Sequence, residues 1–212
     1  ADSEVFVTPM AAVAGAVADE MLETMLVEAK KPDSCIDHLR KIYVNNGGDI
    51  AFWLNEGESF SIGVVDNPQI PELNAKVSLA HESQVRGIAT SGWRGRSLSL
   101  GIADAVTVLA KSAAVADVAA TLIANEVIVD FPGIEKRPAS EVKDDSDLGM
   151  IPVTVVVPDL AEDKIYIALE QGAKSARKFI KDGKITAAYL SLQKQTLVIE
   201  NDDKIERAII NN

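Results

Sequence analysis

The chain consists largely of short runs in which apolar and polar residues alternate, a pattern typical of β-strands that are buried on one face. Two of these runs, 41–45 and 49–54, are separated by an Asn-Gly-Gly turn, which predicts a tight hairpin. A second hairpin is expected about residues 194 and 195, near the end of the chain. Strands are further expected at 4–7, 60–65, 76–80, 85–90, in one or two segments within 97–110, and at 126–132, 151–157, 185–193 and 196–200.

Three longer stretches predict helices instead. The first, 10–28, follows Thr8 as N-cap and Pro9 as first helical residue, and its opening turns are almost entirely Ala, Gly and Val. The second, 113–125, is rich in alanine, and the third, 160–181, is amphipathic and ends before a glycine. Because strands and helices do not alternate regularly, we predict an α+β fold of one domain spanning 1–212, with helices packed on a largely antiparallel sheet.

The amino-acid composition restricts the kinds of molecule that the protein is expected to bind. The formal net charge is −11, whereas a nucleic acid or an anionic membrane surface requires a cationic face, so neither is expected as a partner. No apolar run is long enough to span a bilayer. The one cysteine, Cys35, cannot form an internal disulfide and suits a reducing compartment, so we expect a cytoplasmic location. From the start at Ala1 without a methionine we expect that a front segment is missing, and homo-oligomerisation stays open.

The stretch 87–125 is the densest in potential chemistry. A small-residue turn carries Arg94 and Arg96, whose guanidinium groups can bind phosphate or carboxylate, although two loop arginines are more often only solvated. Asp117 and Thr121 lie four residues apart on the predicted helix and therefore share a face. A carboxylate and a hydroxyl in this arrangement suit Mg²⁺, which prefers oxygen ligands. Alternatively, Asp117 only stabilises the start of its own helix and the threonine is a packing residue.

Other chemistries have little support. With one cysteine and two histidines the chain lacks the spacing of a zinc site, and it has no Walker loop or nucleophile elbow. A hydrolase in which His81 activates Ser91 or Ser97 stays open. The acidic run 144–147 lacks the spaced ligands of a calcium loop, so we predict that it is a solvated part of a long polar connector, 133–149.

Several blocks of the sequence occur in the order seen in the ApbE superfamily, which includes the FAD:protein FMN transferases. The chain resembles in particular a short ApbE-like branch of that superfamily, over roughly residues 5–130. The blocks are PMAAVAGAVAD at 9–19, VNNGGDI at 44–50, ATSG at 89–92, SLSLGIADAV at 97–106 and ADVAAT at 116–121.

The resemblance implies an α+β fold of two joined β-rich lobes, with FAD or FMN bound between them. It implies that Asp117 and Thr121 hold Mg²⁺, and that the flavin nucleotide lies against the glycine turn of the first hairpin and against the small-residue turn. Arg94, Arg96 and Ser97 are further candidates for contacting the ligand. The candidate ligand-binding residues are therefore Gly47, Gly48, Asp49, Thr90, Ser91, Gly92, Arg94, Arg96 and Ser97.

The chain departs from the transferases at two places. Ala14 stands where the transferases carry a lysine, and residues 96–101 stand where they carry a histidine-containing Asp-Pro segment. If the protein is an enzyme, we therefore expect an FMN-transferase-like transferase with altered catalytic residues. The leading hypothesis is binding of a flavin nucleotide or a related phosphate-bearing small molecule, with Mg²⁺-assisted transfer. The alternative is a non-catalytic ligand-binding or assembly module linked to sulfur and homocysteine metabolism, with which some relatives in this branch are associated.

Overall fold

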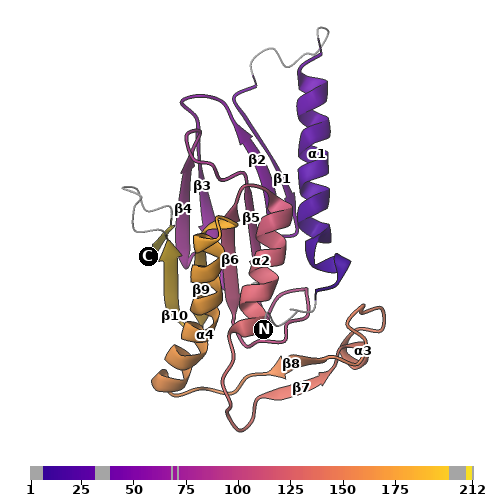
Figure 1. The fold of residues 1–212 in the computed structure, drawn as a ribbon, viewed down its shortest axis with the longest axis vertical. Helices are drawn as coiled ribbons and strands as arrows, with labels where there is room; N and C mark the ends of the chain where they lie inside the picture. The colour runs from indigo at the N-terminus through magenta and orange to yellow at the C-terminus, as the bar shows by residue number, and fades with distance from the viewer. Residues whose placement is uncertain (1–6, 32–38, 68, 71, 201–208, 212) are drawn as a thin grey trace.

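A six-stranded antiparallel sheet forms the centre of the protein (Figure 1). The structure is a computed structural model, and it describes residues 7–31, 39–67, 69–70, 72–200 and 209–211. The strand order is β1-β2-β5-β6-β9-β10, so strands far apart in sequence lie side by side. The strands are β1 (Lys41–Asn46), β2 (Asp49–Leu54), β5 (Gly87–Ser91), β6 (Ala105–Ala110), β9 (Ile185–Leu192) and β10 (Gln195–Glu200).

The remaining strands of the described residues form two smaller antiparallel sheets. The three-stranded sheet has the order β11-β4-β3, and the two-stranded sheet pairs β7 with β8. Their strands are β3 (Ser59–Val64), β4 (Ala75–Ala80), β7 (Glu135–Pro138), β8 (Pro152–Val156) and β11 (Ile209–Asn211). The helices are the 3₁₀ turn η1 (Pro9–Ala12), then α1 (Val13–Ala29), α2 (Ala113–Glu126), the single turn α3 (Ala139–Val142) and α4 (Glu162–Lys181).

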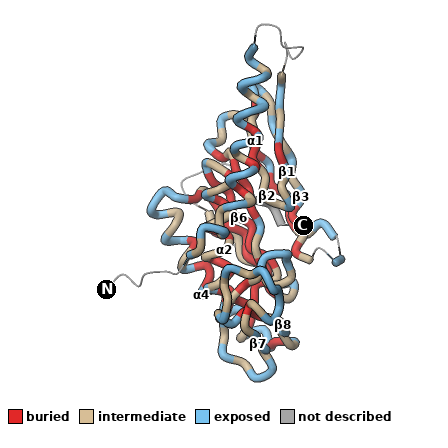
Figure 2. Tube along the Cα trace, turned by 90° about the vertical axis from the view of Figure 1, so that its right-hand side faces the viewer, coloured by how far each residue is buried: buried red, intermediate tan, exposed pale blue. Residues whose placement is uncertain are grey.

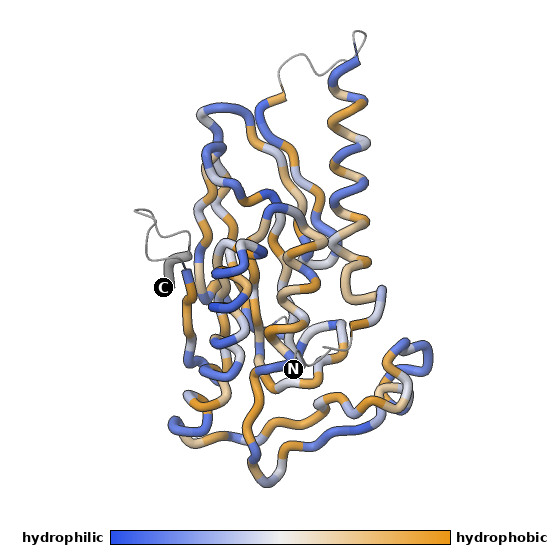
Figure 3. The backbone as a smooth tube through the Cα atoms, viewed as in Figure 1, coloured by the Kyte–Doolittle hydropathy of each residue, from blue (hydrophilic) through white to orange (hydrophobic). Residues whose placement is uncertain are grey.

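The central strands β6 and β9 are buried on both faces of the sheet, and their side chains divide between two cores because successive residues of a strand point to opposite faces. On β6, Val106 and Val108 join the core under α2 and α4, whereas Leu109 joins the core shared with β3 and β4. α1 covers β1 and β2 through a smaller cluster around Ala18 and Leu22. Figure 2 shows buried residues concentrated along these central elements, and Figure 3 shows that hydrophobic residues follow them. Among the described helices, none is both long and apolar enough to cross a membrane.

The predicted α+β class with helices on antiparallel sheet is confirmed, as are the hairpin at residues 47 and 48 and the three long helices. The closing hairpin is also confirmed, with its turn at Gln193 and Lys194, both at positive φ. The strand expected at 4–7 falls almost entirely outside the described residues, and Val7 is not in a strand.

Three predictions of local structure are wrong. Within 97–110 the strand β6 at 105–110 is confirmed, but 97–104 forms no second strand, because Leu100 N–H bonds to the Asn125 side chain and Ile102 N–H to Val127 O. The strand expected at 126–132 is absent too, because α2 extends to Glu126 and the residues that follow it are not in a strand. The connector 133–149 contains β7 and α3, and together with the loop beyond them and β8 it forms an excursion, residues 135–156, that we call the arm. Residues 209–211 form β11, which pairs with β4.

A buried carboxyl group, Asp66, lies where the loop after β3 meets β9. It is 8% exposed and accepts hydrogen bonds from the Tyr189 hydroxyl at 3.0 Å and the Ser191 hydroxyl at 2.5 Å. Its other oxygen, Oδ1, is buried without a hydrogen-bond partner in the described part of the chain. Burial raises the pKa of Asp66 above its usual value because the charged form loses its hydration.

We therefore expect Asp66→Asn to flatten the dependence of stability on pH. The wild-type fold holds the Asp66 proton more tightly than the unfolded chain, so its free energy of unfolding falls as pH rises above the ordinary carboxyl pKa, by up to about 1.4 kcal/mol per pH unit. Asparagine still accepts from both hydroxyls and cannot ionise. Urea unfolding between about pH 5 and 8 measures this, with the exposed Asp130→Asn as control. Parallel curves for Asp66→Asn and wild type would contradict it.

Candidate functional site

The site is built on a close crossing of α1 and α2. Gly15 of α1 faces the start of α2, where a Cβ atom at this position would lie 2.3 Å from the carbonyl oxygen of Ala113. One turn later, the Asp19 carboxylate accepts hydrogen bonds from the amides of Ala113 and Ala114, both at 2.9 Å. These amides have no partner within their own helix, so α1 caps α2 across the crossing.

Asp117 lies on α2 next to this crossing and points at the first turn of α1. Its Oδ2 accepts a hydrogen bond from Gly15 N–H at 3.0 Å. Burial raises the pKa of Asp117, while hydrogen bonds from the amides of Gly15 and Ala14 act in the opposite direction. The side chain of Asn46, in the hairpin turn, in turn donates to Ala14 O at 3.1 Å. Asp117 is therefore bound to a different helix rather than capping its own, and Ser112 caps α2 instead, through Val115 N–H.

A second carboxylate, Asp49, follows the hairpin turn and lies close enough to Asp117 to feel its charge. The pKa of Asp49 is raised to about 7, first by burial and then by the negative charge of Asp117. A hydrogen bond from the backbone of Thr90 and the positive charge of Arg96 oppose this rise. The fold thus gathers candidate residues from β2, β5, the following loop and α2.

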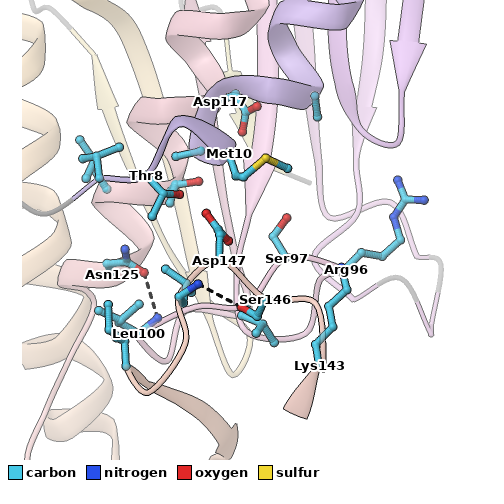
Figure 4. A pocket seen from close by; sticks show the side chains of 18 of the residues that line it. Thr8, Met10, Arg96, Ser97, Leu100, Asp117, Asn125, Lys143, Ser146 and Asp147 are labelled. Carbon is cyan, nitrogen blue, oxygen red and sulfur yellow. Dashed lines mark hydrogen bonds between the residues drawn. The ribbon is translucent and has the colours of Figure 1, made fainter. Parts of the chain in front are cut away.

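A pocket of about 780 Å³ opens between η1, α2, the loop after β5 and the arm (Figure 4). This volume is in the range of pockets that hold drug-sized ligands. Asp117 and Met10 lie on one wall, and Ser146 and Asp147 of the arm lie opposite (Figure 4). Apolar side chains supply much of the rest: Val7, Leu98, Leu100, Leu122, Leu148 and Ile151.

Four of the candidate residues line this pocket together: Arg96, Ser97, Asp117 and Thr121. They come from two segments about twenty residues apart, and the predicted sharing of one helix face by Asp117 and Thr121 is what brings that pair to the pocket.

The remaining candidates are not among the residues that line the pocket. Arg94 donates to Asp104 at 2.6 Å and stacks on Trp93, with its guanidinium carbon 4.5 Å from the ring centre. The Thr90 hydroxyl bonds to that of Thr107 at 2.8 Å. Ser91 ends β5, Gly92 packs against the backbone of Asp104, and Gly48 N–H donates to the Asn45 side chain. Gly47 lies against the guanidinium of Arg96, which lines the pocket.

Sequence reasoning missed the arm. Lys143, Asp145, Ser146 and Asp147 line the pocket, although the acidic run was predicted as solvated loop. The aspartates are indeed exposed, but they face a cavity rather than open solvent alone. A polar loop has the same composition in both situations, so no local signal distinguishes them. Asn125 was missed as well, although it anchors residues 99–101 at the base of the pocket.

Asp117 and Thr121 could supply only part of the coordination shell of a Mg²⁺ ion. Among the described residues, no three His, Cys, Asp or Glu side chains form a metal-binding group. Mg²⁺ does not need an all-protein cage, since it commonly takes one or two protein oxygens and completes its shell with water and substrate phosphate. A carboxylate and a hydroxyl that line one pocket suit that mode. The open triad hypothesis gains no support, because the His81 ring bonds to Leu54 O at 2.8 Å rather than to Ser91 or Ser97.

Comparison with known proteins gives the family. The family model described as AbpE bacteria matches residues 1–207, and the chain belongs to this ApbE-like family. A UPF0280 protein of Methanopyrus kandleri is 34% identical over 151 residues, which are 71% of this chain and 56% of the relative. A UPF0280 protein of Methanobrevibacter smithii is 38% identical over 123 residues, which are 58% of this chain and 47% of the relative. The chain spans about half the length of these relatives.

Proposed function

We propose that this protein binds a flavin nucleotide, or a related phosphate-bearing small molecule, in the pocket between η1, α2 and the arm. The observation that carries the proposal is the convergence of Arg96, Ser97, Asp117 and Thr121 on one cavity of about 780 Å³. Apolar side chains suit a flat ring system, and polar side chains suit the anionic part of such a ligand. Family membership supports the same class of ligand.

A cation is part of the proposal because of the charge of the lining. Among the described residues that line the pocket, four carry carboxylates, Asp117, Glu126, Asp145 and Asp147, and two carry cationic side chains, Arg96 and Lys143. This balance alone would oppose a phosphate. A Mg²⁺ ion held by Asp117 and Thr121 would offset it and would supply a bridge to phosphate oxygens.

The same group of residues suits Mg²⁺-assisted transfer chemistry. A transfer step needs a group that accepts a proton near neutral pH, and such groups have pKa values close to the working pH. Asp49, with its pKa raised to about 7, is the described residue next to Asp117 with that property. Because Asp49 is not among the residues that line the pocket, the proposed transfer chemistry rests on Mg²⁺, which Asp117 and Thr121 would hold and which would polarise the phosphate.

A crystal structure of the protein grown with FMN and Mn²⁺ tests where the ligand lies. Mn²⁺ replaces Mg²⁺ at oxygen-rich sites and is located by its anomalous scattering. We expect an anomalous peak within coordination distance of Asp117 and Thr121, and flavin density between α2 and the arm. Flavin density in another place, such as the apolar hollow of about 250 Å³ beside Tyr43 and Phe60, would overturn the assignment of the site.

A further inference from the structure

The arm is attached to the body of the protein at its base. Lys136 Nζ donates to Leu100 O at 2.6 Å, and Thr154 N–H donates to Ser99 O at 2.9 Å. Beyond these contacts, every hydrogen bond recorded for residues 139–151 stays within the arm. The tip of the arm, residues 143–147, is hydrophilic (Figure 3) and borders the pocket without a hydrogen bond to the described residues of the opposite wall. The tip is therefore placed to contact whatever fills the pocket.

Two cationic side chains line one side of this pocket. Figure 4 shows Lys143 from the arm and Arg96 from the loop after β5 on the same side, with Ser97 close by. The Lys143 side chain is 59% exposed, and its recorded ion pair with Asp145 is long, at 3.9 Å. Within the described residues, the Arg96 guanidinium makes no hydrogen bond or ion pair, although it feels the charge of Asp49. Neither cation is thus strongly neutralised by a neighbour.

We propose that Lys143 is a ligand-binding residue, which together with Arg96 binds the phosphate group of the ligand from the arm side of the pocket. This inference rests on the proposed function, since the phosphate belongs to the same ligand. An ammonium group on a flexible stem acts as a point charge that can follow a phosphate, whereas Arg96 can bind it in a bidentate manner. The ligand would then lie between α2 and the arm, where the two cations would offset the charge of its phosphate together with the Mg²⁺ that Asp117 and Thr121 would hold.

Asp147, in the same tip as Lys143, carries the opposite charge and therefore provides a control for the role of Lys143. Asp147 points into the middle of the pocket, toward the wall that carries Asp117 (Figure 4). The negative charge of Asp147 disfavours the binding of a phosphate in the pocket, whereas the positive charge of Lys143 favours it. Replacing either residue by its neutral counterpart should therefore change the affinity for an anion in opposite directions, whereas damage to the arm would change both in the same direction.

Equilibrium titration of the full chain in EDTA with FMN and with riboflavin, which lacks the phosphate, tests this role. We expect Lys143→Gln to weaken FMN binding roughly 5-fold, as for a partly exposed ion pair, and to leave riboflavin binding unchanged. Asp147→Asn should tighten FMN binding, and Lys178→Gln, which removes an equivalent charge on the exposed face of α4, should change nothing. Equal FMN affinity of Lys143→Gln and wild type, or an equal loss for riboflavin, would overturn the inference.

A second measurement separates this inference from the proposed function. If the wild-type chain binds neither FMN nor riboflavin, the proposed function fails, but the anion site is still tested with inorganic pyrophosphate. Acetylation of individual lysines, followed by mass spectrometry, should then show that millimolar pyrophosphate slows the modification of Lys143 several-fold and leaves Lys178 unaffected. Equal acetylation of Lys143 with and without pyrophosphate would reject the anion site.

Discussion

Replacing Asp117 with asparagine is expected to abolish the contribution of Mg²⁺ to ligand binding. In wild type, Mg²⁺ should tighten the binding of FMN or FAD, because in the proposal Asp117 would hold the ion and the ion would offset the charge of the phosphate. Asparagine keeps an oxygen that accepts the hydrogen bond from Gly15, so the α1–α2 crossing should remain intact. It lacks the charge that Mg²⁺ requires. We expect the affinity in Mg²⁺ to fall by at least about 10- to 100-fold, the loss seen even for residues that only support a metal ligand.

The controls for this prediction separate the metal from the fold. Asp130→Asn makes the same charge change at an exposed position outside the pocket and should bind like wild type. In EDTA, Asp117→Asn should bind as well as wild type or slightly better, because one carboxylate has been removed from the pocket. Titration calorimetry with and without Mg²⁺ measures both. A variant that retains the full Mg²⁺ effect would show that the ion binds elsewhere.

Replacing Gly15 with alanine should cause one of the largest losses of stability in the chain. The added Cβ would lie 2.3 Å from the backbone oxygen of Ala113. Because neither atom can move by rotation of a side chain, the two helices cannot relieve this contact in place. The helices must separate, which strains the bonds from Gly15 to Asp117 and from Asp19 to the start of α2. Alanine gains about 1 kcal/mol of helix propensity over glycine, but overpacking and lost contacts cost more, so we expect a net loss of about 2–4 kcal/mol.

Thermal and urea unfolding measure this effect, and a loss of that size should lower the Tm by about 10 °C in a chain of this length. Ala16→Ser provides a matched control, since residue 16 is exposed on the same helix and small surface changes usually stay within about 0.5 kcal/mol. Because Gly15 N–H bonds to Asp117, the alanine variant should also bind ligand more weakly at temperatures where it is folded. A Gly15→Ala variant as stable as Ala16→Ser would show that the crossing is looser than described.

Much of the fold follows from local signals. The glycine turn adopts positive φ at residues 47 and 48, and it joins β1 to β2 as the Asn-Gly-Gly sequence predicts. The alanine-rich helix and the amphipathic helix lie within a few residues of their expected bounds. The segment 97–104 was mispredicted because its β-like pattern is overridden by Asn125 and by Gly101, where a Cβ would lie 1.9 Å from the Ala124 carbonyl oxygen.

The sequence predicts the parts of the candidate site that depend on residues close together in the chain, and not the contacts between distant residues. The sharing of a helix face by Asp117 and Thr121 follows from a spacing of four residues, and both line the pocket. The bond between Asp117 and Gly15 joins residues 102 positions apart, and no pattern within either helix encodes it. Arg94 and Arg96 look alike in the sequence, yet one pairs with Asp104 and the other faces the pocket, because residue 104 is brought back by β6. The two-lobe arrangement and the cytoplasmic location stay predictions.

Titration of the unmodified chain with FMN and FAD, first in Mg²⁺ and then in EDTA, tests the central claim most directly. We predict saturable binding of at least one of the two nucleotides, with an affinity that falls when Mg²⁺ is removed, because the carboxylates around Asp117 then face the phosphate without a cation. No binding of either nucleotide at up to about 1 mM, the weakest affinity that a specific site of this kind should show, would contradict the account.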